Sequence, residues 1–439
     1  MRQLANVADN IVALLARQVL TSSLTAILMI FFLPHYVGDV GLGKITFAVG
    51  LYTMLLVVTN LGTDVFTVKQ VALDRRRLSE LLWHAYFIRL VLGIVVGSAV
   101  ALVAHMLPLD SDSKAVLTVA SLILIVMSLD QAQVGALRGL ENMRWIAVSD
   151  VANKSTLLIV GAAVLVTGHG VVAYFLAMLG GTIVGFLINF SYLARRHLER
   201  PTINPLAARY LLVGGFPFLM TGAIQQFYTY SDAITLRFLT RDAVVGWYGA
   251  ANQLFGTLNF IPLVIVTAML PALTRFYAED KATMRLAVEK GMLAVLTTGV
   301  PIAAACLILS GDLIHFLHYP PEFQHSVPLL AIFALTLPVT GSLMLVGTVV
   351  IAADKQKEWA VTMAITAVIS VILDVLLILF FDRVYANGAI GVSTAAVISE
   401  ALMMALGIRL VPAGVIGRSV LLALIRSVAA SLVMLAAMG

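Results

Sequence analysis

The stretch AVLTVASLILIVMSLDQAQVGAL, residues 115–137, is apolar over most of its length and carries a single charged residue, Asp130. A helix rises about 1.5 Å per residue, so a helix of this length crosses the roughly 30 Å hydrocarbon core of a bilayer. Similar stretches recur along the whole chain. The sequence therefore predicts an all-α, polytopic membrane protein.

The composition agrees with a lipid environment. Of the 439 residues, 61% are hydrophobic and only 12% are charged, whereas an ordinary soluble domain has about 25% charged residues. The mean hydropathy is +1.00. A net charge of +5 could suit nucleic acid, but the basic residues form short clusters between apolar runs. Such clusters set membrane orientation, so no nucleic-acid partner is expected.

Working outward from 115–137, we predict further spans at 11–33, 44–64, 84–107, 146–167 and 171–193. After a polar stretch, the second half contains predicted spans at 211–239, 246–271, 291–310, 326–350, 359–381, 387–408 and 417–437. The predicted organisation is a six-helix transmembrane bundle at 1–194, a cytoplasmic connector at 195–210, a second six-helix bundle at 211–410 and a thirteenth transmembrane helix within 411–439. The two bundles are expected to surround a central cavity.

Basic residues divide unevenly between alternate loops. One set of loops holds Lys44, Lys114, Arg241 and Arg383. The other set includes Lys69, Arg75, Arg76, Arg77, Arg195, Arg196, Arg200, Arg275, Lys281, Lys290, Lys355 and Lys357. Because cytoplasmic loops carry the excess of Lys and Arg, the second set and the N-terminus are predicted to be cytoplasmic, in a multi-pass protein of the inner membrane.

The two halves of the chain show a weak internal similarity. DVGLGKITFAVGL (39–51) aligns with VVGWYGAANQLFG (244–256), which pairs Gly41 with Gly246. Chance similarity is an open alternative at this identity. A true repeat predicts two bundles related by an axis along the membrane normal.

Motifs for covalent chemistry are absent from the sequence. GDVGLGKI (38–45) has P-loop spacing, but Ile45 stands where a Ser or Thr should bind magnesium, so a glycine-rich turn is predicted. His315 and His318 supply only two possible metal ligands, and Cys306 is the single cysteine. No Ser-His-Asp grouping or paired carboxylate is recognisable. We expect a non-enzyme with no cofactor and no metal site.

Charges inside predicted spans are the strongest functional signal, because a charge in hydrocarbon costs several kcal/mol unless it faces a cavity or a partner. These residues are Arg17, Arg89, Asp130, Asp150, Lys154, Asp232, Arg237, Asp374 and Glu400. Snorkelling from a helix end is the alternative for Arg17, Arg89 and Arg237. Asp150 and Lys154 are four residues apart, so mutual neutralisation is the alternative for that pair.

The span at 211–239 is the most polar. Gly214, Gly215 and Pro217 are expected to break its start, and Gln225, Gln226, Tyr228, Tyr230 and Asp232 follow. Amides and tyrosines bind sugar hydroxyls and stack on the apolar faces of sugars. Hydrogen bonding between helices is the structural alternative.

The quoted pieces resemble those of a known family. VGDVGLGKITFAVGL (37–51), NLGTDVFTVKQVA (60–72), SDAITLRFLTRDAVVGWYGAANQL (231–254) and MLPALTRF (269–276) are similar to segments of O-antigen and polysaccharide flippases in the multidrug, oligosaccharidyl-lipid and polysaccharide exporter superfamily. The resemblance implies alternating-access export of a polyprenyl-diphosphate-linked saccharide from membrane lipid. It also implies partners in polysaccharide or lipopolysaccharide biosynthesis, namely a polymerase and glycosyltransferases. Family members have twelve or fourteen helices, so an odd thirteenth span is a departure.

These observations together define a predicted site. The substrate-binding candidates are Arg17, Arg89, Lys154, Gln225, Gln226, Tyr230, Asp232 and Arg237, and the ion-coupling candidates are Asp374 and Glu400. Three alternatives are a multidrug or cation antiporter of the same superfamily, a flippase for the peptidoglycan precursor and a membrane scaffold. The antiporter should carry a carboxylate in its first helix, whereas 11–33 contains Arg17 and no acid. A scaffold would need neither the polar helix nor the buried ions.

Overall fold

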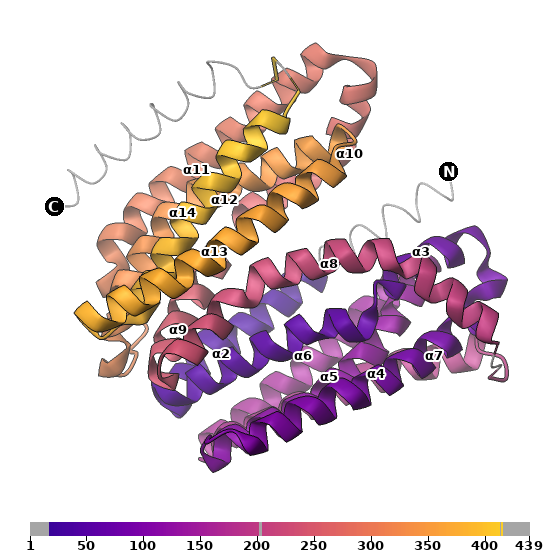
Figure 1. Cartoon of the computed structure of the whole chain (residues 1–439), viewed down its shortest axis with the longest axis horizontal. Coiled ribbons are helices and arrows are strands. Elements are labelled where there is room, and N and C mark those ends of the chain that lie inside the picture. Colours follow the sequence, from indigo (N-terminus) through magenta and orange to yellow (C-terminus); the bar gives the residue numbers. More distant parts are fainter. Residues whose placement is uncertain (1–16, 202–203, 413, 416–439) are drawn as a thin grey trace. The chain divides into compact units, whose positions relative to one another are not determined.

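A computed structural model describes residues 17–201, 204–412 and 414–415 (Figure 1). All regular elements in these ranges are helices, and ten helical stretches are long and apolar enough to cross a membrane. The predicted all-α, polytopic membrane fold is therefore confirmed. The predicted span at 417–437 lies outside the described residues.

The chain divides into two compact units, Met1–Tyr230 and Ser231–Gly439, and the division falls inside one long helix, α8. In the N-terminal unit the first helical stretch begins at Arg17 and continues through η1 into α2. The elements of this unit are η1 (Ile27–Phe32), α2 (Leu33–Asn60), α3 (Thr63–Leu73), η2 (Arg75–Arg77), α4 (Leu78–Met106), α5 (Ser111–Gly139), α6 (Met143–Val166), α7 (Gly170–Arg196) and the first part of α8 (Pro205–Leu239).

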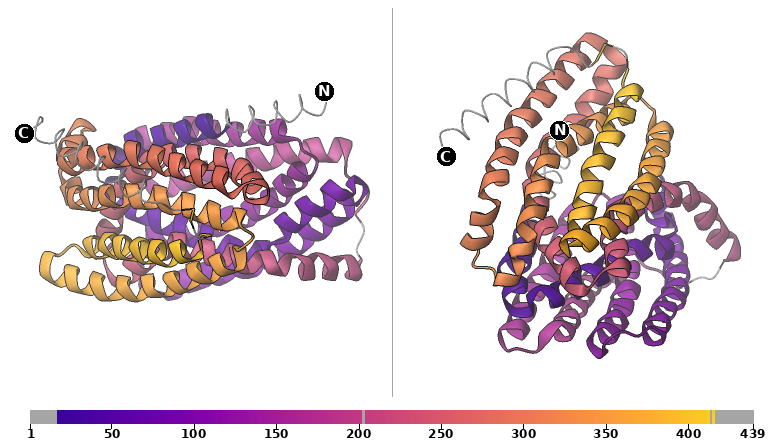
Figure 2. Two further views of the ribbon diagram at one scale, coloured as in Figure 1. Left: turned by 90° about the horizontal axis from the view of Figure 1, so that it is seen from above. Right: turned by 60° about the vertical axis from the view of Figure 1, so that its left-hand side comes forward.

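The C-terminal unit begins near the end of α8. Its further elements are α9 (Asp242–Leu258), α10 (Phe260–Glu279), α11 (Lys281–Phe316), η3 (Pro321–Ser326), α12 (Val327–Ala352), α13 (Gln356–Tyr385) and α14 (Gly388–Leu410). Helices α11 to α14 run side by side (Figure 2). Their core is built from branched aliphatic side chains and Met, such as Val288, Met292 and Leu345.

Glycine conformations set the first turn of the chain. Gly38 has φ 64° and ψ −171°, which interrupts the helix between the first two predicted spans. An L-residue with a side chain rarely adopts this backbone geometry. The turn that was predicted from GDVGLGKI is confirmed at Gly38.

A second break separates α2 from α3. Leu61 and Gly62 both lie in the left-handed region, at φ 48° and 66°. A Cβ on Gly62 would lie 2.4 Å from the carbonyl oxygen of Gly215 on α8, and a Cβ on Gly215 would lie 2.6 Å from the carbonyl oxygen of Leu61. The expectation that Gly214 and Gly215 break α8 is wrong, because α8 continues through them. These glycines let α8 pack directly against the break between α2 and α3.

Two predicted boundaries also differ from the observed ones. The predicted single span 246–271 is divided into α9 and α10 at Asn259. Pro262 has no backbone N–H for a helical bond to the preceding turn, which favours a new helix start here. The connector predicted at 195–210 overlaps both flanking helices, because α7 ends at Arg196 and α8 starts at Pro205. Proline is well suited to a first helical position.

The two units repeat the same order of elements and the same neighbours. In the N-terminal unit α4 packs on α5, α6 on α7 and α5 on α7, and the corresponding contacts in the C-terminal unit are α11 on α12, α13 on α14 and α12 on α14. Asp74 accepts a hydrogen bond from the N–H of Arg76, and Asp280 accepts one from the N–H of Ala282. These aspartates begin equivalent turns, as expected of helix-capping residues. The repeated pattern supports the predicted internal duplication.

Candidate functional site

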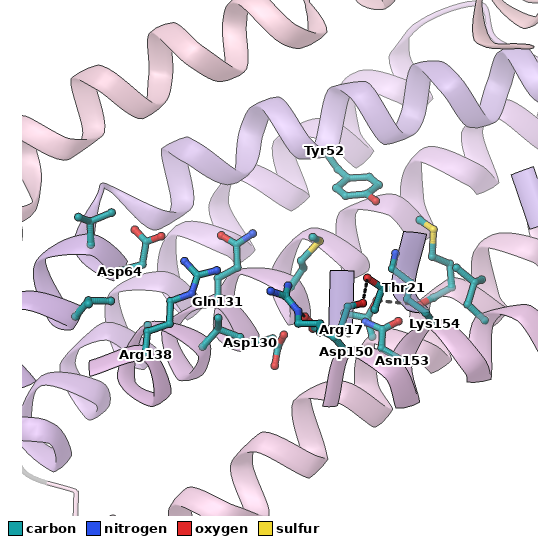
Figure 3. A pocket seen from close by; sticks show the side chains of 18 residues that line it. Arg17, Thr21, Tyr52, Asp64, Asp130, Gln131, Arg138, Asp150, Asn153 and Lys154 are labelled. Atoms are coloured by element: carbon teal, nitrogen blue, oxygen red, sulfur yellow. Dashed lines mark hydrogen bonds and ion pairs between the residues drawn. The ribbon is translucent and has the colours of Figure 1, made fainter. Parts of the chain in front are cut away.

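A pocket of about 600 Å³ lies inside the N-terminal unit (Figure 3). We call it the N-terminal pocket. Side chains reach it from the first helical stretch and from α2, α3, α5, α6 and α7. Its polar lining consists of Arg17, Thr21, Tyr52, Asp64, Asp130, Gln131, Arg138, Asp150, Asn153, Lys154 and Thr182. It therefore offers cations, carboxylates, amides and hydroxyls in one concave site, as ligand-binding pockets do.

Arg17 and Lys154 both line the pocket near the carboxylate of Asp150. The guanidinium of Arg17 donates to Asp150 and forms an ion pair with it. Lys154 follows Asp150 by one helical turn on α6, and Asp150 is its charged neighbour. About a quarter of the Arg17 side chain, 25%, remains exposed. A planar guanidinium beside an ammonium is a suitable receptor for phosphate oxygens, and here Asp150 occupies that receptor.

The other two acids of the pocket also have partners. Asp130 accepts a hydrogen bond of 2.9 Å from the amide of Asn189. Asp64 lies 3.9 Å from the guanidinium of Arg89. The lining of the pocket thus combines carboxylates with the cations Arg17, Arg138 and Lys154.

Arg89 lies beside the pocket but does not line it. Its side chain is completely buried. The guanidinium donates to the hydroxyl of Thr63 at 2.8 Å, to the side-chain oxygen of Asn60 at 3.1 Å and to the carbonyl oxygen of Ser128 at 2.9 Å. These bonds tie α5 to both sides of the break between α2 and α3. We interpret Arg89 as a positioning residue that holds Asp64 in the pocket wall.

The polar residues of α8 separate into three environments. Tyr230 neighbours Tyr52, which lines the N-terminal pocket. Gln226 is half-buried, and Gln225 is exposed and donates to the hydroxyl of Thr229. Arg237 forms a 2.5 Å ion pair with Asp242 at the turn between α8 and α9. The structure thus brings Tyr230 close to the pocket and places Arg237 at a helix end.

Acidic residues gather in the C-terminal unit. Asp374 on α13 is completely buried, and Asp232 on α8 is close enough to interact with it. Glu400 on α14 accepts a 2.5 Å hydrogen bond from the hydroxyl of Thr340. A negative charge on Asp232 repels a negative charge on Glu400. Among the described residues, no group of three or more His, Cys, Asp or Glu side chains is arranged to hold a metal ion. The structure therefore places Asp232 and Asp374 next to each other, and it places Glu400 against Thr340 in the same unit.

Lys44, the lysine of the P-loop-like string, is engaged at a helix start. Its ammonium lies 2.5 Å from Asp110, whose side chain also caps α5 by accepting from the N–H of Ser113. Partial desolvation opposes ionisation of Asp110, but the bonds from Lys44 and Ser113 outweigh it and lower the pKa of this carboxyl to about 2. Lys44 has the role of a structural partner, not of a nucleotide ligand.

Several residues of the pocket were missed from the sequence. Gln131 and Asn153 are ordinary amides, and Arg138 lies just beyond the predicted end of its span. Asp64 belongs to the quoted string NLGTDVF, and the preceding Gly62 was a signal of the backbone break that exposes this carboxylate to the pocket. Asp130 and Asp150 stood out as charges within spans, but their helical positions did not reveal that they share a pocket.

Comparisons with protein families give two matches. A model described as "Polysaccharide biosynthesis protein" matches residues 7–277. The MatE model matches residues 217–376. A search of curated proteins found no match.

Solved structures share the fold at low sequence identity. A structure titled as the lipid II flippase MurJ in an inward closed conformation has a TM-score of 0.66 and 16% identity, and it covers 97% of this chain and 91% of that chain. An inward-facing multidrug resistance MATE family transporter of the MOP superfamily also has a TM-score of 0.66 and 16% identity, with 93% and 94% covered. The eukaryotic MATE transporter AtDTX14 has a TM-score of 0.61 and 10% identity, with 97% and 98% covered. At these identities the likeness concerns the fold alone.

Proposed function

This chain belongs to the polysaccharide biosynthesis protein family of the MOP exporter superfamily, and from that premise we propose that it flips a polyprenyl-diphosphate-linked oligosaccharide across the inner membrane. The saccharide moves from the cytoplasmic to the outer leaflet by alternating access. The chain performs no covalent chemistry, and glycosyltransferases and a polymerase act before and after it. The N-terminus and the α7–α8 connector are cytoplasmic, in keeping with the uneven distribution of Lys and Arg.

The observation that carries this proposal is that Arg17, paired with Asp150, and Lys154 line the same N-terminal pocket. A substrate diphosphate takes the place of the Asp150 carboxylate and receives hydrogen bonds from Arg17. Within a pocket of reduced dielectric, such charge-assisted bonds are stronger than in water. Asn153 and Gln131, together with Gln226 and Tyr230 of α8, offer polar contacts for the sugar.

Asp150 gives this site a way to release its ligand. In the unloaded pocket Asp150 neutralises Arg17, so no isolated cation is left in the membrane. When the pocket opens to the outer side, return of Arg17 to Asp150 competes with the diphosphate. The carboxylate of Asp150 thus competes with the diphosphate for Arg17, which weakens the grip on the ligand and favours its release.

Flipping in proteoliposomes tests this function. A purified sample should move a fluorescent polyprenyl-diphosphate oligosaccharide between leaflets, as measured by access of a lectin or a membrane-impermeant quencher. The same vesicles are tested with the peptidoglycan-precursor lipid and with a cationic dye. Selective movement of the precursor lipid, or proton-dependent accumulation of the dye with no saccharide movement, would contradict the proposal and favour one of the two alternative transporters.

The acidic residues Asp374 and Glu400 of the C-terminal unit are proposed to couple transport to an ion gradient. Buried carboxylates that lie close together need a proton or a cation to offset their mutual repulsion. Asp374→Asn is therefore expected to reduce gradient-driven flipping at least tenfold, with little change in substrate binding. The matched control is Asp312→Asn, an acid near the end of α11. The measurement is the initial flipping rate with and without an imposed proton or sodium gradient, and unchanged gradient dependence in Asp374→Asn would refute a coupling role.

A further inference from the structure

A second, apolar groove of about 760 Å³ lies elsewhere in the N-terminal unit. We call it the α4–α8 groove, and it shares no lining residue with the N-terminal pocket. Its walls come from α4, α5, α7 and the start of α8 and include the aromatic residues Trp83, Tyr86, Phe186 and Phe190. Its volume falls in the range of about 300–1,000 Å³ that is typical of small-ligand sites.

The aromatic walls are packed against one another. Phe186 and Phe190 are stacked with 5.9 Å between ring centroids, and Tyr86 lies 6.4 Å from Phe190. Trp83 meets Tyr86 edge to face at 5.7 Å. Rings held in this way form a preformed surface, because each ring restricts its neighbour.

The chain between α7 and α8 is fastened to α4 at one end of the groove. Trp83 donates to the carbonyl oxygen of Glu199 at 3.0 Å, and the N–H of Glu199 donates to Ser79 at 2.9 Å. The N–H of Asn204 donates to the buried imidazole of His84 at 2.8 Å. Because three hydrogen bonds fix this end, the groove is a built feature and not an accidental gap between helices.

The outer wall of the groove is an exposed apolar surface on a candidate membrane-spanning helix. Phe87 and Leu90 line it and remain 60% and 42% exposed, on a helix that is long and apolar enough to cross a membrane. An apolar groove with such a wall is accessible to lipid chains along its length.

The polar rim of the groove lies at the basic end of the unit. Arg209, an exposed residue in the first turns of α8, lines it. Other basic residues at the same helix ends are Arg75, Arg76, Arg77, Arg138, Arg144, Arg195, Arg196 and Arg200, and they outnumber the acids Asp74, Glu80, Glu141 and Glu199. Basic pockets between membrane helices favour anionic headgroups.

We propose that the α4–α8 groove is a binding site for an anionic glycerophospholipid, with an acyl chain against the aromatic walls and the headgroup phosphate at Arg209. This site is separate from the saccharide pocket. An acyl chain needs only apolar contact, which Phe87, Leu90 and Phe190 supply, while the guanidinium selects the negative headgroup. The bound lipid is thus a structural ligand that fills the space between α4 and α8.

Native mass spectrometry of the full chain in detergent tests the site. The protein is purified with phosphatidylglycerol or with phosphatidylcholine of identical acyl chains, and the retained lipids are counted. We expect phosphatidylglycerol to be retained preferentially, and Arg209→Gln to reduce that preference about fivefold. Leu90→Trp, which fills the groove, should remove the bound lipid altogether.

Two matched variants make the experiment decisive. Arg200→Gln removes a nearby charge that does not line the groove, and Leu102→Trp enlarges another exposed leucine of α4 outside it. Both should retain lipid like the parent protein. Equal retention of the two phospholipids, or equal loss in Leu90→Trp and Leu102→Trp, would show non-specific annular lipid and overturn the proposal. Preferential retention of an added polyprenyl phosphate over phosphatidylglycerol would overturn it as well, by assigning the groove to the transport substrate.

Discussion

Arg17→Ala is expected to lower the binding of a polyprenyl-diphosphate saccharide by ten- to a hundredfold and to abolish flipping at normal protein abundance. The variant removes the planar donor that Asp150 holds in the unloaded pocket. A hydrogen bond to a charged group contributes about 1.5–3 kcal/mol, and each 1.4 kcal/mol changes an equilibrium constant tenfold. The measurements are the Kd for the lipid-linked saccharide and the flipping rate in proteoliposomes. Arg17→Lys should retain part of the activity, because lysine keeps the positive charge but lacks the planar set of guanidinium donors.

Two further variants separate substrate binding from general charge effects. Arg200→Ala removes an exposed cation of the connector and should flip substrate normally. Asp150→Asn removes the competing carboxylate, so it should bind substrate more tightly than the parent protein while releasing it more slowly. Full flipping by Arg17→Ala would contradict a substrate-binding role and leave the ion pair with Asp150 as a structural contact.

Arg89→Leu is expected to lower the unfolding free energy by at least about 3 kcal/mol, because three acceptors lose their donor at about 1–3 kcal/mol each. It leaves the hydroxyl of Thr63, the amide of Asn60 and the carbonyl of Ser128 without their shared donor. The protein should be recovered in low yield and with a lower melting temperature. Arg89→Lys should rescue little, because one ammonium cannot span these three acceptors.

The matched control for Arg89 is Arg76→Leu, which removes an exposed arginine next to α4. Fluorescence-detected gel filtration and thermal unfolding in detergent distinguish the two variants. If Arg89→Leu were made at normal abundance and melted normally, the predicted structural role of its hydrogen bonds would be contradicted.

The fold could be predicted from the sequence because the hydrocarbon core of a bilayer requires each spanning segment to be apolar and to satisfy its own backbone hydrogen bonds. A span such as 115–137 must be apolar and helical wherever it packs, so its length and composition suffice. Finer features depend on tertiary contacts. The glycines at 214 and 215 looked like helix breakers, yet Gly215 admits the backbone near Leu61 and Gly214 admits the ring of Phe66.

The candidate site was only partly predictable, for a related reason. Charge within a span indicated Arg17, Arg89 and Lys154 as unusual, but one-dimensional spacing cannot tell which of them reach the same space. Arg17 and Lys154 line one pocket. The guanidinium of Arg89, in contrast, donates hydrogen bonds to residues at the break between α2 and α3 and on α5. That difference depends on where α5 crosses α2 and α3, which local sequence does not encode.

The repeat of elements in the two units has an evolutionary consequence. When α6 and α13 are laid first residue on first residue, Lys154 meets Ala367, and Asp374 meets Gly161. The turn aspartates Asp74 and Asp280 are shared by both copies. Under the predicted duplication, the two units kept one scaffold but carry different charged residues inside it, so the interiors of the two halves now differ in their chemistry.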